Sequence, residues 1–302
     1  MEINLGTLRG AYINFNTCYQ QGFATITPQW RRVATEISSD TEENSYPWLG
    51  LTTQFREWLG DRAIQGLAAH DYVVKNRDFE NTVGIDRNKF MDDKIGLFKP
   101  IFEMLGQNAA LHPDKLTFGL LKQGLTAPCY DGLPFFAPNH PTTTSAGAPT
   151  TIGNVDSGGT GPYWFLLSTK RAIKPLVFQV RMPYKFVALV NETDPNVFFR
   201  KQYVYGVECR VNAGFGPWQM AYASNQPLDS AHYQNARTYF GSLYGENGEP
   251  LDMEADLLVY PPTLEGSALT LLEATMVGVS TGGSATNIWK GTAERLKTSW
   301  VA

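Results

Sequence analysis

The chain is poor in charged residues, which make up 18% of its 302 residues, whereas about a quarter is usual in a globular protein. Its net charge is −4, and the sequence contains no basic tail and no run of lysine and arginine. Strong non-specific binding to nucleic acids depends on such clusters, because their cations neutralise backbone phosphates. The composition therefore argues against a nucleic-acid-binding protein.

Long apolar runs and a disulfide framework are also missing. No apolar run approaches the roughly 20 residues of a membrane-spanning helix, so we expect no membrane partner. The first ten residues, MEINLGTLRG, lack the apolar core of a signal peptide. Cys18, Cys129 and Cys209 are an odd number at wide spacing, which does not suit paired cysteines. We therefore expect a reducing compartment such as the cytoplasm.

Familiar catalytic and nucleotide-binding motifs do not occur either. One group has the residue types of a cysteine hydrolase, with Cys129 as nucleophile, His140 as base and Asp131 as the orienting group. A zinc ion could use Cys129, His140 and His112, although their spacing matches no zinc motif. We favour a structural interpretation, in which the cysteine is buried, Asp131 forms a turn and the histidine is a polar loop residue. We predict no catalytic residue, no cofactor and no metal site.

Aromatic residues, in contrast, are abundant at 13% of the chain, and hydrophobic residues reach 43%. Subunit interfaces favour tyrosine, tryptophan and phenylalanine over lysine and glutamate. A surface that is largely covered by other subunits would explain this composition, and a β-rich monomer would explain it almost as well. The length allows roughly two domains.

The longest segment with helical periodicity runs from Asp92 to Gly124. Apolar residues recur at three- and four-residue steps on one stripe: Ile95, Phe98, Ile101, Phe102, Leu105 and Ala109. Asp92 and Asp93 are placed as N-terminal capping residues, and Gly124 as the stop. We expect Pro100 to bend the helix, and Pro113 to begin a second one. The segment is either an ordinary core helix or a long spine.

Strand signals lie on both sides of this helix. Residues 1–45 read as an arm with one or two short elements, and Phe55–Arg87 reads as a long polar hairpin extending from the body. Thr142–Pro162 is small and polar, which predicts a flexible loop. Tyr163–Tyr222 predicts an antiparallel meander, in which Val197, Phe199, Lys201, Tyr203, Tyr205 and Val207 share one face. We interpret the aromatic residues Phe198 to Tyr205 as sheet core.

The final segment, from Pro227 onward, is predicted to be helical again. Tyr233, Ala236 and Phe240 would share one helix face. A strand is expected at Leu257–Tyr260, followed by a second helix that carries Leu264, Ala268, Leu271 and Leu272. A short strand would close the chain.

Several blocks, taken in order, resemble one family. They are YPWLGLTTQFREWLGDRAIQGLAAHDYVVKNRDFENTVGIDRNKFMDD, IGLFKPIFEMLGQNAALHPDKL, TAPCYDGLPFFAPNHP, NVFFRKQYVYGVECRVNAGFGPWQMAY and LLVYPPTLEGSALTLLEA. The set is similar to the major head subunit of Mu-like phages. The resemblance implies an α+β chain with the Hong Kong-type fold of tailed-phage major capsid proteins. It would comprise an N-terminal arm (1–45), an extended β-hairpin loop (46–91), a peripheral domain (92–225, with a spine helix at 92–124 and a meander at 163–222) and an axial domain (226–302).

The family implies a structural protein that assembles into hexamers and pentamers of an icosahedral phage head around double-stranded DNA. The expected partners are copies of the same chain, a scaffold protein, a portal and a decoration protein, with no specific DNA binding. The expected location is the virion, after assembly in the host cytoplasm. We place subunit contacts at Trp48, Phe55, Trp58, Tyr72 and Phe79. A Cys129/His140 hydrolase and a non-viral compartment shell of the same fold are the alternatives.

Overall fold

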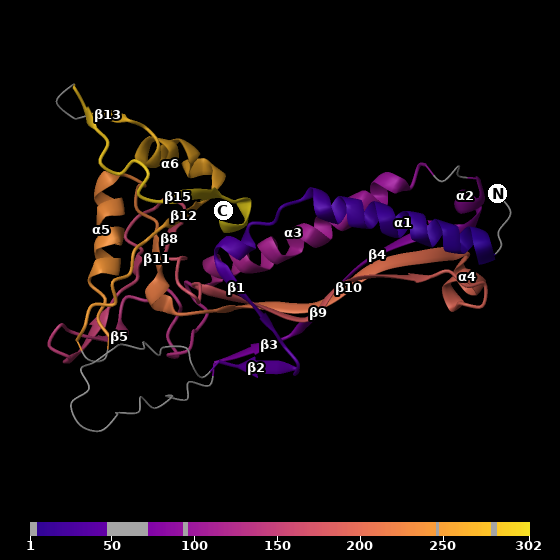
Figure 1. Ribbon diagram of the computed structural model, residues 1–302, viewed down its shortest axis with the longest axis horizontal. Helices are drawn as coiled ribbons and strands as arrows, with labels where there is room; N and C mark the ends of the chain where they lie inside the picture. Colours follow the sequence, from indigo (N-terminus) through magenta and orange to yellow (C-terminus); the bar gives the residue numbers. More distant parts are fainter. Residues whose placement is uncertain (1–4, 47–71, 93–95, 246–247, 279–282) are drawn as a thin grey trace.

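The computed structural model describes residues 5–46, 72–92, 96–245, 248–278 and 283–302. Two sheets lie at opposite ends of an elongated molecule (Figure 1). The first has the strand order β1 (Ala34–Ser38), β9 (Leu176–Leu189), β10 (Gln202–Phe215) and β4 (Arg77–Asp86). The second has the order β15 (Glu294–Lys297), β12 (Leu257–Tyr260), β8 (Trp164–Leu167), β11 (Ala221–Ser224) and β7 (Val155–Asp156).

Helices α1 (Leu5–Thr25) and α3 (Lys99–Gln123) lie side by side over the four-stranded sheet. Their shared core is rich in aromatic rings, and Phe15 stacks on Phe102 with ring centroids 4.1 Å apart. At the other end, α5 (Ser230–Gly241) and α6 (Glu265–Leu272) flank the five-stranded sheet. The long helices and the long strands thus form one arm of the molecule, and the short elements form a compact second part.

The predicted long helix exists, but three details of the prediction are wrong. It begins at Lys99, and Asp92 is instead the last residue of the short helix α2 (Arg87–Asp92). Pro100 lies in the first turn of α3, where its missing N–H is not needed. Pro113 neither ends the helix nor starts a new one. Packing outweighs its cost, because residues on both sides of the proline, including Ala109 and Phe118, are buried.

The far end of α3 agrees with the prediction. Gly124 follows the last helical residue, and its N–H donates to the carbonyl of Leu120 at 2.9 Å. The buried stripe is partly as expected, since Phe102, Leu105 and Ala109 are buried, whereas Ile101 is 41% exposed.

The N-terminal arm is more regular than expected, because α1 continues for 21 residues along α3. Two glycines allow the close approach. A Cβ atom on Gly22 would lie 2.1 Å from the carbonyl oxygen of Glu103, and one on Gly106 would lie 2.1 Å from that of Tyr19. Further along, the buried Asp114 carboxylate of α3 accepts hydrogen bonds from the backbone N–H groups of Gln29 and Trp30. The arm is therefore tied to the long helix at several points.

The described part of the predicted hairpin at Phe55–Arg87 does not form a separate projecting pair of strands. Short strands β2 (Glu43–Ser45) and β3 (Val73–Lys75) pair antiparallel, and residues 47–71 between them lie outside the described residues. The rest of the predicted hairpin belongs to the body, because β4 pairs with β10 along its whole length, from Arg77↔Val211 to Asp86↔Gln202. Local alternation in the sequence could not show which strand β4 would choose as its partner.

The predicted meander divides between the two sheets. Strands β9 and β10 form an antiparallel pair in the first sheet, while β8 and β11 pair in the second. The prediction that Val197 to Val207 form one strand is wrong, because Pro195–Arg200 is the short helix α4. Lys201 then has φ 52°. From Tyr203 onward the alternation holds, since Tyr203, Tyr205 and Val207 are buried.

The five-stranded sheet crosses the predicted domain boundary at residues 225 and 226, because β7, β8 and β11 precede it and β12 and β15 follow it. The helix face around Tyr233 and the strand Leu257–Tyr260 are confirmed. Helix α6 buries Ala268, Leu271 and Leu272 as predicted, whereas Leu264 lies before it, in a short 3-10 helix (Pro262–Leu264). The predicted loop at 142–162 contains strands β5 (His140–Thr143), β6 (Pro149–Ile152) and β7. A further hairpin is formed by β13 (Met276–Gly278) and β14 (Ser284–Thr286).

Among the described helices, none has the length and apolar character to cross a membrane.

Candidate functional site

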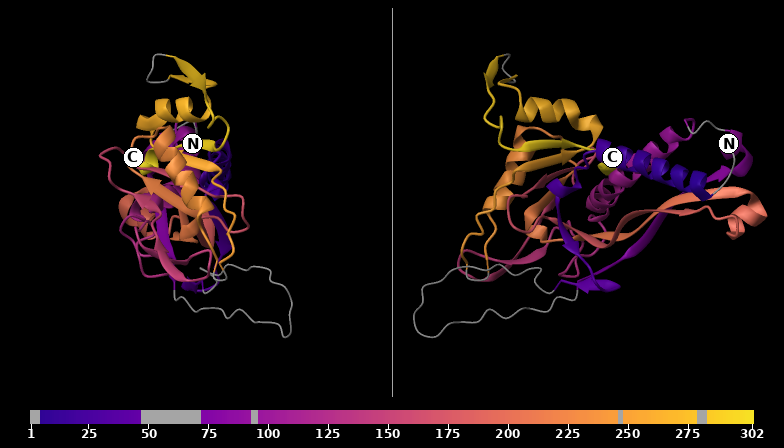
Figure 2. Two further views of the ribbon diagram at one scale, coloured as in Figure 1. Left: turned by 90° about the vertical axis from the view of Figure 1, so that its left-hand side faces the viewer. Right: turned by 45° about the vertical axis from the view of Figure 1, so that its right-hand side comes forward.

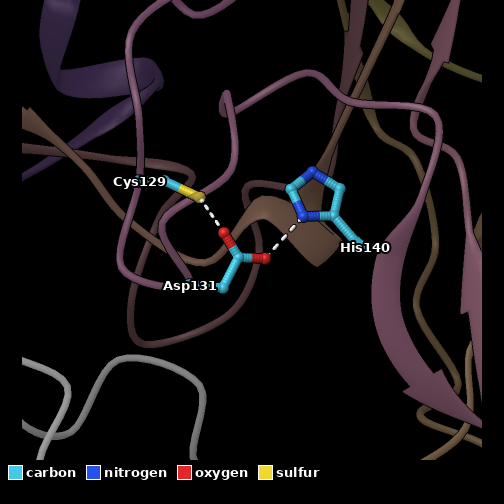
Figure 3. Close-up of side chains that lie close together, drawn as sticks. All are labelled: Cys129, Asp131 and His140. Carbon is cyan, nitrogen blue, oxygen red and sulfur yellow. Dashed lines mark hydrogen bonds and ion pairs between the residues drawn. The ribbon is translucent and has the colours of Figure 1, made fainter.

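The structure does bring Cys129, Asp131 and His140 together, in the segment that leads from α3 to β5 (Figure 3). The Cys129 thiol donates to Oδ1 of Asp131 at 3.1 Å, and Nδ1 of His140 lies 2.6 Å from Oδ2 of the same carboxylate. The backbone N–H of Leu133 also donates to Oδ1, which closes the turn that the Asp-Gly pair predicts. The carboxylate is thus the centre of the group, with the thiol on one side and the imidazole on the other.

The cluster is deeply buried. The His140 side chain has no exposed surface, and that of Asp131 is 5% exposed. The imidazole stacks on Trp218 with ring centroids 4.2 Å apart, and its Nε2 lies 3.3 Å from the carbonyl oxygen of Phe135. Burial alone would raise the pKa of Asp131, but hydrogen bonds from His140 and Cys129 outweigh it and hold that pKa below its usual value. Three hydrogen bonds therefore favour the ionised form of this carboxylate.

This arrangement does not suit a hydrolase. A cysteine nucleophile needs the imidazole within reach of its thiol, to remove the proton, whereas here Asp131 lies between the two side chains. Burial, followed by the contact with Asp131, raises the pKa of the Cys129 thiol well above its usual range. A neutral, buried thiol is a poor nucleophile. The Cys129/His140 hydrolase alternative is wrong for this geometry.

The zinc ligands that the sequence offered as an alternative, Cys129, His140 and His112, do not come together. His112 lies on α3, and its Nδ1 is 2.7 Å from the hydroxyl of Tyr184. Asp131 takes its place near the other two, with the ligand atoms of the three side chains within 4.8 Å of one another. Each of these atoms already has a protein partner, so a metal would have to displace the hydrogen bonds that close the turn.

The segment that carries the cluster instead joins the end of α3 to both sheets. The N–H of Phe136 donates to the carbonyl of Gly124, and its ring packs against Phe165 of β8 with centroids 5.4 Å apart. Phe135 stacks on Phe215 of β10, with ring centroids 4.6 Å apart. The buried Asn154 accepts from the N–H of Ala137 and donates to the carbonyl of Phe135. A satisfied buried polar network of this kind specifies one arrangement of the chain. Its role is structural.

Thiol reactivity tests this interpretation. Cys18, Cys129 and Cys209 are all buried, and burial raises the pKa of each thiol. We expect a disulfide reagent to leave the native chain almost unmodified and to label three thiols after unfolding. Rapid labelling of one thiol in the native protein, abolished by Cys129→Ala, would instead indicate a reactive cysteine. Titration with a chromogenic disulfide reagent measures the rate of labelling and the number of thiols labelled, in the native and in the unfolded protein.

The residues predicted as subunit contacts fall into two groups. Trp48, Phe55 and Trp58 lie outside the described residues. Tyr72 is half-buried, and its hydroxyl accepts from the backbone N–H of Phe215, so it is bound to its own subunit. Phe79 on β4 packs edge-on against His112 and lines a cavity of about 410 Å³ between α3 and the sheet.

The sequence prediction missed one feature, the aromatic pair Phe198 and Phe199, which it assigned to sheet core. The pair lies on α4 and is largely exposed. Pro195 directly after Asp194 was the signal for this helix, since proline is common at the first helical position.

Among the described residues, no group of side chains has the geometry of a catalytic site. The functional class therefore depends on the proteins to which this chain is related. The sequence profile of the family described as Mu-like prophage major head subunit gpT matches residues 8–301. The chain belongs to this family. It is 36% identical to the major capsid protein of Escherichia phage Mu over 278 residues, which are 90% of this chain and 91% of that protein. It is 31% identical to the Mu-like prophage FluMu major head subunit of Haemophilus influenzae, over 88% of each chain.

Solved structures agree with the family. A chain from the procapsid of bacteriophage JBD30 superposes with a TM-score of 0.85 at 35% identity, over 99% of this chain and 100% of that one. A chain from the JBD30 capsid gives a TM-score of 0.79 at 25% identity, over 92% of each. The predicted capsid fold is confirmed, and this chain is a major capsid protein that forms the icosahedral head shell of a tailed phage. It is a structural protein of the virion and not an enzyme.

Proposed function

We propose that the chain forms the pentamers and hexamers of the head, with the five-stranded sheet near the centre of each capsomer. The observation that supports this is the two-ended shape of the subunit, with one compact part and one long arm of helices and strands (Figure 1). A ring of such subunits would place the compact parts together and let the long arms cover area around them. The axial part would then include β7, β8 and β11 as well as residues 226–302.

The proposal also assigns the remaining segments of the chain to parts of the capsid fold. Residues 1–45 form the N-terminal arm, 46–91 include the extended loop, and 92–225 include the spine helix and the long strands of the peripheral part. The small charge, −4, suits a shell around packed DNA, because it gives no strong attraction to the cargo. Assembly in the host cytoplasm, with a scaffold protein, a portal and a decoration protein, completes the proposal.

Expression tests the shell assignment directly. The full chain, produced with the neighbouring head genes, should elute near the void volume in size-exclusion chromatography. Negative-stain microscopy should then show closed particles of uniform diameter. A chain that remains a soluble monomer under these conditions would contradict the proposal.

The proposed subunit contacts give a second test. We infer that Trp48, Phe55 and Trp58 anchor the extended loop on a neighbouring subunit, with Tyr72 and Phe79 at its base. Interface tryptophans often contribute 2 kcal/mol or more, so roughly a thirtyfold weaker contact is expected for Trp58→Ala. Particle yield and the melting temperature of the particles should fall, while subunit expression stays unchanged. Normal yield and normal particle stability would rule out this anchor.

A further inference from the structure

A cavity of about 410 Å³ lies between the long helix α3 and the four-stranded sheet, beside its edge strand β4. Its floor is apolar and includes the buried residues Leu105, Ala109 and Val207. In Figures 1 and 2 the C-terminal turn η4 (Ser299–Val301) lies beside α3. Trp300 of this turn also lines the cavity and is 42% exposed. The helix, the sheet and the turn therefore enclose one space, which we call the α3–β4 pocket.

One wall of the α3–β4 pocket consists of rings that hold one another in place. The hydroxyl of Tyr184 lies 2.7 Å from Nδ1 of His112. Phe79 packs edge-on against the same imidazole, with ring centroids 4.5 Å apart. Small-molecule sites are typically cavities of about 300–1,000 Å³ with mostly apolar walls and a few fixed polar groups. The α3–β4 pocket has this size and this kind of lining.

Two cations lie beside the pocket. Lys115 lines it directly, and the Arg77 guanidinium lies 5.3 Å from the ring centroid of Phe79. Burial, followed by the charges of Lys115 and Arg77, lowers the pKa of His112, so both cations act on the same imidazole. Within the described part of the chain, neither Lys115 nor Arg77 has an acidic partner within ion-pair distance. Their positive charge is therefore not compensated by the subunit itself.

The acidic residues nearest in sequence have other partners. Glu80 is the one acidic residue among the described residues that line the pocket, and its carboxylate accepts a hydrogen bond from the hydroxyl of Thr82. Asp78 pairs with Arg210 at 3.4 Å. Alternation along β4 also places both acids on the sheet face opposite to Phe79. Apolar walls beside free positive charge suit a ligand with an apolar body and one anionic group, because lysine and arginine form strong charge-assisted hydrogen bonds with carboxylates.

We propose that the α3–β4 pocket binds a medium-chain carboxylate, with its carboxylate at Lys115 and Arg77 and its alkyl chain on the apolar floor. A flexible alkyl chain can follow walls that are partly aliphatic and partly aromatic. The bound ligand would stabilise the folded subunit by mass action, since the unfolded chain has no such pocket. This inference concerns the single subunit and does not depend on how subunits are arranged in the head.

Calorimetric titration of the unassembled full chain with decanoate tests the site. We expect one saturable site per subunit, and about tenfold or more weaker binding of decanol, which has the same alkyl chain without the charge. Lys115→Gln should weaken the binding of decanoate by a similar factor and leave that of decanol unchanged. Lys99→Gln is the matched control, since Lys99 is exposed on the same helix and does not line the pocket. Equal affinity for decanoate and decanol, equal effects of the two lysine substitutions, or no saturable binding at millimolar concentration would overturn the proposal.

Tryptophan fluorescence locates the bound ligand independently. Decanoate should change the fluorescence of the native chain, and Trp300→Phe should remove most of that change although the other tryptophans remain. Asn108 is exposed and lines the pocket, so Asn108→Phe should obstruct it and abolish binding without lowering the melting temperature of the subunit. A fluorescence change that persists in Trp300→Phe, or undiminished binding in Asn108→Phe, would place the ligand elsewhere and contradict the proposal.

Discussion

Gly106→Ala should destabilise the subunit by about 3 kcal/mol and release α1 from the long helix. A Cβ atom at this position would lie 2.1 Å from the carbonyl oxygen of Tyr19 and 2.7 Å from the amide nitrogen of Phe23. Both are backbone atoms of α1, so no side-chain rotation can relieve the overlap. The whole helix must move outward, and the stacked rings of Phe15 and Phe102 would separate with it.

Thermal unfolding of purified subunits measures this effect. Gly119→Ala is the matched control, because Gly119 lies in the same helix and a Cβ atom there would meet nothing within 4 Å. Removing a helical glycine without steric cost should stabilise the chain by about 0.5–1 kcal/mol. The two substitutions should therefore shift the melting temperature in opposite directions. A Gly106→Ala chain that melts like the wild type would show that α1 does not pack this closely.

His140→Ala should cost about 3 kcal/mol, because it removes a hydrogen-bond partner of a buried carboxylate and leaves a cavity in the core. The substitution leaves the Asp131 carboxylate buried without its imidazole partner and opens a void against Trp218. His232→Ala is the control, since His232 pairs with Asp229 at 2.8 Å on the surface, where both side chains are partly exposed. An exposed pair contributes at most about 1 kcal/mol. Urea unfolding measures the loss of unfolding free energy in both variants. Equal losses of unfolding free energy would contradict a structural role for the buried cluster.

The same cluster should make the free energy of unfolding depend on pH in the acidic range. The pKa of Asp131 is lower in the folded chain than in the unfolded one, because the bonds from His140 and Cys129 outweigh burial. Its contribution is therefore present above the unfolded pKa of about 4 and is lost as the pH falls through the folded value. Asp131→Asn should flatten the dependence of unfolding free energy on pH below about pH 4. An acid-unfolding curve with an unchanged slope would assign the dependence to other carboxylates.

Much of the helical and strand content followed from local pattern, and the exceptions have clear physical causes. The stop at Gly124, the strand Leu257–Tyr260 and the buried face of α5 are local properties of backbone and periodicity. The continuity of α3 through Pro113 is not local, because it depends on neighbours that hold the helix on both sides of the proline. The helix over Phe198 was missed because aromatic residues also favour strands.

The chemistry of the Cys129 group shows the same division. The residue types indicated a possible site at Cys129, Asp131 and His140, and the turn at Asp131 was predictable from the Asp-Gly pair. The order in which the three side chains contact one another could not be predicted from the sequence. It depends on Trp218 and Phe135, which come from distant parts of the chain and fix the position of the imidazole.

By itself, the sequence determined the family, the absence of recognised catalytic motifs and the positions of most helices and strands, because these depend on composition, spacing and local periodicity. Only the tertiary structure decided which strands share a sheet, how closely α1 approaches α3 at Gly106, and that the aromatic pair of α4 faces outward. The physical reason is that strand partners, helix contacts and burial are set by residues far apart in the chain, and a local pattern fits several such arrangements equally well.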